Sequence, residues 1–282
     1  MVPARTSSRT QTEERTLIAA DGVAVSAAHQ PGPAGGLAFV VAHGFSGSRR
    51  SSSLGRVTRD LANGIPADPD LGSPAAHEGA AQPAAVVTLD FRGHGRSRGS
   101  STLGNREVLD MDAAVRWARL LGYRSVAAVG FSMGASVVVR HAALIGGVDA
   151  VVSVSGPSRW FYRGTPSMRR LHYLVERPSG RLLARLAMGT RIDDHYWDPV
   201  PAEPRALAAQ LAPTPLLVVH GDRDRFFPLD HAQQLADAAG PTGELWIEPG
   251  FGHAEAAIST ELTRRIGTWV RRQLLAAGPV PR

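Results

Sequence analysis

The stretch VAAVGFSMGASVV, residues 126–138, decides the fold of this chain. An apolar run typical of a buried strand leads into Gly130-Phe131-Ser132-Met133-Gly134, and a second apolar run, compatible with a helix, follows. The pattern G-x-S-x-G in this setting predicts a strand, an abrupt turn and a helix, with the hydroxyl of Ser132 raised clear of the sheet. Only residues without a Cβ avoid clashes in so tight a turn, which accounts for the two glycines. The N–H groups that follow would stand at a helix N-terminus, where negative charge is stabilised.

Strands and helices alternate on both sides of this stretch. Residues 16–29 predict a hairpin that turns at Asp21-Gly22. Further strands are predicted at 37–44, 85–91, 125–130, 148–156, 216–222 and 244–250. Helices are predicted at 106–121, from the turn to about Leu144, and at 229–239 and 255–276. Apolar strands joined by helical crossovers predict an α/β fold, with a mostly parallel central sheet of about eight strands and helices on both faces.

Two segments interrupt the alternation. Residues 63–84 are rich in Pro, Gly and Ala and predict a flexible surface loop. Residues 158–212 contain six of the seventeen aromatic residues and amphipathic stretches at 166–176 and 180–188. An aromatic-rich insertion at the carboxyl end of a strand predicts a short helical lid over a ligand crevice; the alternative is a helical excursion that only packs on the sheet. We expect a flexible tail at 1–15 and a single domain over 16–282.

Composition excludes several function classes. The net charge is +6 and the pI is about 10.7, but every cation is Arg, and aromatic residues, at 6%, are not interleaved with the basic ones. This pattern does not favour nucleic-acid binding. The absence of Cys excludes disulfides, thiolate catalysis and Cys-ligated metals. No segment has the features of a secretory signal or a membrane span, so we expect no integral membrane segment and a cytoplasmic protein.

Cofactor motifs are also missing from the sequence. RGHGRSRG (92–99) has its third Gly misplaced for a dinucleotide fingerprint, and a phosphate-binding loop requires Lys, which the chain lacks. The histidines do not have the spacing of metal ligands. We therefore expect neither a cofactor nor a metal.

Five motifs in order along the chain resemble those of the α/β-hydrolase family. They are HGFSGS (43–48), DFRGHGRS (90–97), GFSMG (130–134), HGDRDRFFP (220–228) and GFGH (250–253), each after a predicted strand. The resemblance covers nearly the whole chain and implies the α/β-hydrolase fold, with a nucleophile, an acid and a histidine in the order Ser, Asp, His. Each motif alone is weak, whereas the ordered set is specific.

The chemistry of such a set assigns the candidate catalytic residues Ser132, Asp224 and His253. A serine hydroxyl is a poor nucleophile near neutral pH and requires a general base, and a histidine in a Gly-flanked loop, His253, suits that role. A carboxylate should fix the tautomer of this histidine. Asp222 and Asp224 compete for the position, and the family's acid falls at Asp224. Asp90 is a distant alternative, and we expect it to order the turn after it instead.

The resemblance further implies an oxyanion hole formed by the backbone N–H groups of Met133 and Phe45. Within the expected lid, Trp160, Phe161 and Tyr162 are candidate substrate-binding residues. The chain is thus expected to be a serine hydrolase that cleaves a carboxylic ester or similar acyl bond of a small-molecule acyl substrate through an acyl-enzyme. The same residues serve peptidases, thioesterases and C–C-bond hydrolases, and a binding protein on the same scaffold is a further alternative. The sequence leaves the oligomeric state open.

Overall fold

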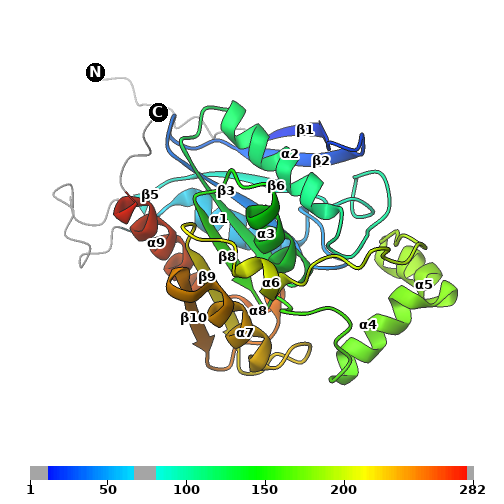
Figure 1. Ribbon diagram of the computed structural model, residues 1–282. Helices are drawn as coiled ribbons and strands as arrows, with labels where there is room; N and C mark the ends of the chain where they lie inside the picture. The colour runs from blue at the N-terminus through cyan, green and yellow to red at the C-terminus, as the bar shows by residue number, and fades with distance from the viewer. Residues whose placement is uncertain (1–11, 67–80, 278–282) are drawn as a thin grey trace, which may run out of the picture.

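The computed structural model describes residues 12–66 and 81–277, and its centre is a mixed sheet of eight strands (Figure 1). The strand order is β1-β2-β6-β3-β7-β8-β9-β10. The strands are β1 (Glu13–Ile18), β2 (Ala24–Gln30), β3 (Leu37–Ala42), β6 (Ala85–Leu89), β7 (Ser125–Phe131), β8 (Ala150–Val154), β9 (Leu216–Gly221) and β10 (Gly243–Glu248). β1 and β2 pair antiparallel, β2 pairs antiparallel with β6, and the strands from β6 to β10 are parallel. The predicted α/β class is confirmed.

Alternation along the central strands divides the core into two layers. In β7, Val126 and Ala128 join one apolar cluster and Ala127 and Val129 join the other, because successive side chains of a strand point to opposite faces. The first cluster is covered by α2 (Glu107–Leu120), α3 (Met133–Leu144), α6 (Pro204–Ala208) and α7 (Leu229–Ala239). The second is covered by α1 (Ser52–Asn63), α8 (Ala254–Ala257) and α9 (Thr260–Ala276). Both faces of the sheet are therefore covered along its central strands.

Three details differ from the sequence-based expectations. The continuous helix expected at 255–276 is two helices, because Ile258 is extended and Ser259 caps a new helix by accepting from Leu262 N. Helix α1 was not predicted, although its buried residues Leu54, Val57 and Leu61 have helical spacing. Strand β1 begins at Glu13, inside the expected N-terminal tail.

The remaining part of that tail, residues 1–11, lies outside the described residues. So does most of the loop expected at 63–84, whose described ends form a small two-stranded sheet of β4 (Ile65–Pro66) and β5 (Ala81–Gln82). Within 12–66 and 81–277, no helix combines the length and apolar character needed to cross a membrane.

The two helices predicted in the insertion are present as α4 (Pro166–Glu176) and α5 (Pro178–Met188). Thr165 caps α4 by accepting from Met168 N, and α5 ends at Gly189, which has a left-handed conformation. A left-handed conformation at the C-terminus of a helix favours glycine, which has no Cβ. The two helices contact each other and project away from the rest of the molecule (Figure 1).

Candidate active site

Ser132 lies at the sharp turn between β7 and α3. Its backbone has φ 52° and ψ −113°, which is rare for a residue with a side chain. The flanking glycines are required by contact: a Cβ on Gly130 would lie 2.2 Å from the carbonyl oxygen of Gly134, and one on Gly134 would lie 2.5 Å from that of His43. The sequence-based explanation, that a Cβ at either position would clash in the tight turn, thus holds. The turn places Ser132 at the carboxyl edge of the sheet.

A continuous pair of hydrogen bonds joins Ser132, His253 and Asp224. Ser132 Oγ lies 2.9 Å from Nε2 of His253, and Nδ1 of the same ring lies 2.8 Å from Oδ2 of Asp224. An ionised carboxylate can only accept, so Nδ1 donates to Asp224 and leaves Nε2 free to accept from the serine hydroxyl. The ring of His253 is therefore the tautomer with its proton on Nδ1, which a general base acting through Nε2 requires.

The carboxylate of Asp224 is completely buried and held by the backbone. Its Oδ1 accepts from the N–H groups of Phe226 (2.7 Å) and Phe227 (3.1 Å). Burial alone would raise the pKa of Asp224, but the hydrogen bond from His253, with that from Phe226, outweighs it and lowers the pKa. The competing Asp222 accepts instead from Gly250 N at 2.7 Å and lies exposed. The structure thus brings Asp224, and not Asp222, to the histidine.

The loop after β3 leaves one backbone donor available beside Ser132. Three acceptor side chains take other N–H groups of this loop: Glu255 Oε1 binds Gly44 N (3.0 Å), His94 Nε2 binds Ser46 N (3.3 Å) and Asp90 Oδ1 binds Arg49 N (2.7 Å). Among the described residues, neither Phe45 N nor Met133 N has an acceptor. Both residues line the same pocket as Ser132. Two unoccupied donors therefore remain, on the residues the sequence had singled out.

The other motif histidines have structural contacts. His43 Nδ1 donates to Gly44 O and Nε2 accepts from Phe91 N at 3.0 Å, which ties the ends of β3 and β6 together. Burial lowers the pKa of His43 to about 3, so its ring stays neutral. His220 lies beneath the acid and donates through Nε2 to Phe227 O at 2.9 Å. These contacts give both histidines a structural role.

A pocket of about 250 Å³ opens at Ser132 beneath the α4–α5 segment. Trp160, Phe161 and Tyr162, the candidate substrate-binding residues, all line it. The ring of Trp197 contacts those of Trp160 and Phe161, with centroids 5.1 and 5.8 Å apart. Most of the lining surface is apolar, and further apolar residues of the wall come from both the core and the insertion: Phe45, Leu103, Met133, Pro157, Met168, Leu171, Val175 and Phe227. Such a pocket suits an apolar group next to the serine.

Two contacts at the site were not anticipated. Phe226 stacks on the ring of His253, with centroids 4.3 Å apart. Glu255 is buried two residues after His253, and its Oε1 accepts from Gly44 N. Phe226 belongs to the motif that supplied Asp224, so its proximity to the site was open to inference. Nothing in the sequence indicates that Glu255 turns inward.

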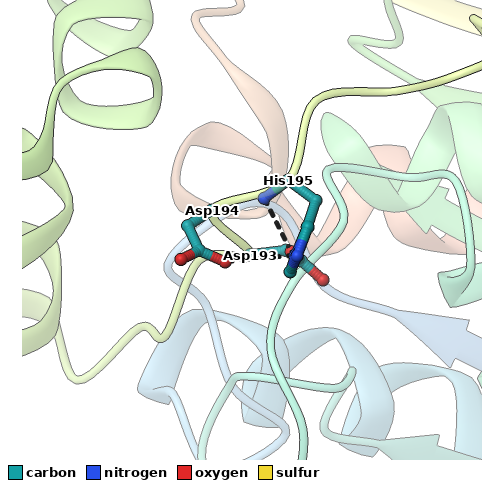
Figure 2. A group of neighbouring side chains, drawn as sticks. All are labelled: Asp193, Asp194 and His195. Carbon is teal, nitrogen blue, oxygen red and sulfur yellow. Dashed lines mark hydrogen bonds and ion pairs between the residues drawn. The ribbon is translucent and has the colours of Figure 1, made fainter.

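An acidic group stands at the rim of the pocket. Asp193, Asp194 and His195 lie on the loop between α5 and α6, with potential ligand atoms within 4.8 Å of one another (Figure 2). Asp193 Oδ1 accepts from both the N–H and Nδ1 of His195, and this interaction raises the pKa of His195. Asp194 and His195 are exposed. These contacts account for the group as a locally bonded turn, and we assign it no ion.

Comparisons with known proteins identify the family and the fold of the chain. The model of the alpha/beta hydrolase family matches residues 39–259. A monoacylglycerol lipase from Mycolicibacterium smegmatis is 27% identical over 210 residues, which are 60% of this chain and 70% of that protein. A structure of the Pyrococcus furiosus esterase Pf2001 superimposes with a TM-score of 0.69 at 21% identity, covering 97% of this chain and 96% of that one. Est1E from Butyrivibrio proteoclasticus, solved with ferulic acid bound, has a TM-score of 0.59 at 18% identity and coverages of 93% and 100%. At these identities the solved structures show the shared fold.

Proposed function

Because the chain belongs to the alpha/beta hydrolase family, we propose that it is a serine hydrolase that cleaves carboxylic esters or similar acyl bonds through an acyl-enzyme on Ser132. The observation that carries this proposal is the pair of hydrogen bonds from Ser132 Oγ through the His253 ring to Asp224, at 2.9 and 2.8 Å. A serine, a base and an orienting carboxylate at hydrogen-bond distance are the parts that acyl transfer needs.

In the proposed reaction, Ser132 Oγ attacks the acyl carbon while His253 Nε2 takes its proton. The protonated ring is stabilised by Asp224, whose lowered pKa keeps it ionised at working pH. The ring then returns the proton to the leaving alcohol, and the acyl-serine ester remains. A water molecule, deprotonated by the same Nε2, attacks that ester in a second step, and the acid product leaves with Ser132 restored.

Both tetrahedral intermediates carry a negative charge on the former carbonyl oxygen. We assign its stabilisation to the unoccupied N–H groups of Phe45 and Met133. Each donor of this kind contributes roughly 10²–10³ in rate. Because Glu255, His94 and Asp90 hold the neighbouring N–H groups of the loop, the Phe45 donor is positioned before the substrate arrives, so little reorganisation is needed during the reaction.

The substrate we propose is a small ester with an apolar acyl or alcohol group. The apolar and aromatic lining of the pocket supports this choice, and so do the similarity to a monoacylglycerol lipase and the ferulic acid bound in Est1E. We also propose that α4 and α5 form a lid, since Met168, Leu171 and Val175 of α4 form part of the wall above Ser132. The lid would exclude water and select the acyl group.

Labelling with a fluorophosphonate tests the nucleophile. We expect wild type to take up one equivalent and Ser132→Ala none. Ser136→Ala is a matched control, because Ser136 lies on the next turn of α3, also lines the pocket, and bonds to Met133 O instead of His253. Hydrolysis of p-nitrophenyl esters from acetate to decanoate then measures the depth of the pocket. A folded wild-type protein that is neither labelled nor active would reject the proposal in favour of a ligand-binding role.

A further inference from the structure

The outward face of α5 is apolar, although it is exposed. Leu182, Leu183 and Leu186 are 56%, 52% and 75% exposed. Residues three and four apart share one side of a helix, so these leucines form a single stripe. The opposite side of α5 is fixed against α4, because Gly180 and Ala184 are buried there and a Cβ on Gly180 would lie 2.3 Å from Tyr173 O. The stripe therefore points away from the protein.

The exposed apolar residues of the molecule gather in this region. Eight of the sixteen large hydrophobic side chains that are exposed in the described chain lie within residues 161–200: Phe161, Tyr173, Leu182, Leu183, Leu186, Met188, Tyr196 and Val200. Scattered exposed leucines are ordinary on a protein surface. Leu182, Leu183 and Leu186 are instead neighbours on one helix, and a contiguous apolar group indicates an interaction site.

The same helices carry unneutralised positive charge. α4 and α5, with the residue between them, contain five arginines, Arg169, Arg170, Arg177, Arg181 and Arg185, against one acid, Glu176. Glu176 is taken by Arg163 and His172, at 2.5 and 2.8 Å. Within the described residues, Arg170, Arg177 and Arg185 have no ion pair and are exposed. A helix pair that exposes both an apolar stripe and free guanidinium groups is complementary to a surface that is apolar inside and anionic outside.

We propose that the outer face of the α4–α5 hairpin docks on an anionic phospholipid surface, with the leucine stripe among the acyl chains and the arginines at the phosphates. A second copy of the chain fits less well. A two-fold dimer pairs the same patch on both subunits, and that would bring the arginines of two hairpins together. The hairpin projects from the rest of the molecule (Figure 1), and a soft lipid layer needs no matching groove to receive it.

Docking in this way places the pocket directly beneath the lipid-bound hairpin. The inner face of the same hairpin, through Met168, Leu171 and Val175, lines the pocket above Ser132. None of the outer leucines and none of Arg170, Arg177 and Arg185 line it. In this proposal the outer face of the hairpin binds the lipid surface and the inner face contacts the substrate, so lipid binding and hydrolysis can be tested separately.

Sedimentation with lipid vesicles tests the proposal. We expect wild type to sediment with vesicles of equimolar phosphatidylcholine and phosphatidylglycerol, to do so less as salt is raised, and not to sediment with phosphatidylcholine alone. The triple variant Leu182→Ser/Leu183→Ser/Leu186→Ser should lose binding by at least about tenfold. The triple variant Arg170→Gln/Arg177→Gln/Arg185→Gln should lose about 10²-fold, at about fivefold for each arginine.

Matched controls separate the hairpin from general surface properties. Leu120→Ser/Leu144→Ser/Leu275→Ser removes three leucines that are 85%, 52% and 70% exposed elsewhere. Arg59→Gln/Arg98→Gln/Arg124→Gln removes three exposed arginines elsewhere. Both control variants should bind vesicles within about twofold of wild type, because neither touches the stripe or the charges beside it.

Three outcomes would overturn the proposal. They are a wild type that does not bind the anionic vesicles, controls that lose as much binding as the hairpin variants, and a wild-type dimer in sedimentation velocity that the leucine variant converts to a monomer. The last would show that a second copy covers the stripe. Binding is measured without substrate, and the six hairpin positions lie outside the pocket, so hydrolysis of a short soluble ester should be unchanged in both variants. A negative result for lipid binding would therefore not contradict the proposed hydrolase activity.

Discussion

Replacement of Glu255 tests whether the donor at Phe45 is positioned from the histidine loop. Glu255 Oε1 accepts from Gly44 N at 3.0 Å, one residue before that donor. The contact is tight, since a Cβ on Gly44 would lie 3.3 Å from Glu255 Oε2 and 3.3 Å from Ser132 Cβ. A hydrogen bond to a charged group contributes about 1.5–3 kcal/mol. If that energy orients the donor in the transition state, Glu255→Ala should lower kcat by about 10–10²-fold, below the full loss of one donor.

The assay compares Glu255→Ala with Glu255→Gln, which keeps an acceptor of the same length. We expect the glutamine variant to retain kcat within about threefold, with KM little changed in both. A trifluoromethyl ketone, which forms the oxyanion on Ser132, should bind Glu255→Ala more weakly by the same factor as the loss in kcat. Thermal unfolding controls for a loss of folded protein. The reasoning is refuted if the alanine variant keeps wild-type kcat, or if the glutamine variant falls as far as the alanine variant.

Three further predictions concern single residues. Asp224→Asn should lower kcat by about 10⁴-fold by stabilising the wrong tautomer of the histidine, whereas Asp222→Asn should stay within about tenfold; steady-state kinetics with a short ester would contradict this if the two were reversed. Burial lowers the pKa of His231 to about 4 in the folded protein, whereas the same imidazole in the unfolded chain protonates below about pH 6.5. Between these two pH values only the unfolded chain binds the proton, so the free energy of unfolding falls by about 1.4 kcal/mol for each pH unit that the pH is lowered. Urea unfolding at pH 7 and pH 5 should therefore show a loss in wild type that is smaller by about 2 kcal/mol in His231→Asn; equal losses would refute the assignment. Phe45→Ala should reduce kcat/KM far less than Ser132→Ala, because the donor is main-chain; equal losses in folded protein would show that the ring itself is needed.

Local patterns predicted most of the sheet because each central strand is an apolar run that ends in a chemically distinctive turn. The same logic brought Ser132, Asp224 and His253 to one edge, since parallel strands deliver their carboxyl ends to the same place. Helix α1 was missed although its signal was present: Ser51 precedes a helical spacing of apolar residues. The break between α8 and α9 depends on a buried, extended Ile258, which no helical periodicity reveals.

The inward turn of Glu255 belongs to a different class of feature, because it depends on tertiary contact. Glu255 follows Ala254, which has φ 55° and whose N–H is held by Ser155 Oγ at 3.0 Å. Alanine does not ordinarily adopt this conformation, so neither propensity nor motif predicts it. The hydrogen bond from another strand's end decides the direction of the chain here, and with it the position of the buried carboxylate.

Backbone strain points to the same region by an independent route. Six residues other than glycine have positive φ in the described chain: Ser46, Leu103, Ser132, Ser155, Phe161 and Ala254. Each conformation costs on the order of 1–3 kcal/mol and persists only where its surroundings over-determine it. Every one of the six is at the proposed site. Ser46 is in the loop after β3, Leu103 and Phe161 are in the pocket wall beside Ser132, and Ser155 and Ala254 form the hydrogen bond that holds the loop of His253. Glycine at these positions would relieve the strain, so stability alone does not account for the residues present. Because strained backbone clusters at functional sites, its position around Ser132 supports the proposed reaction centre.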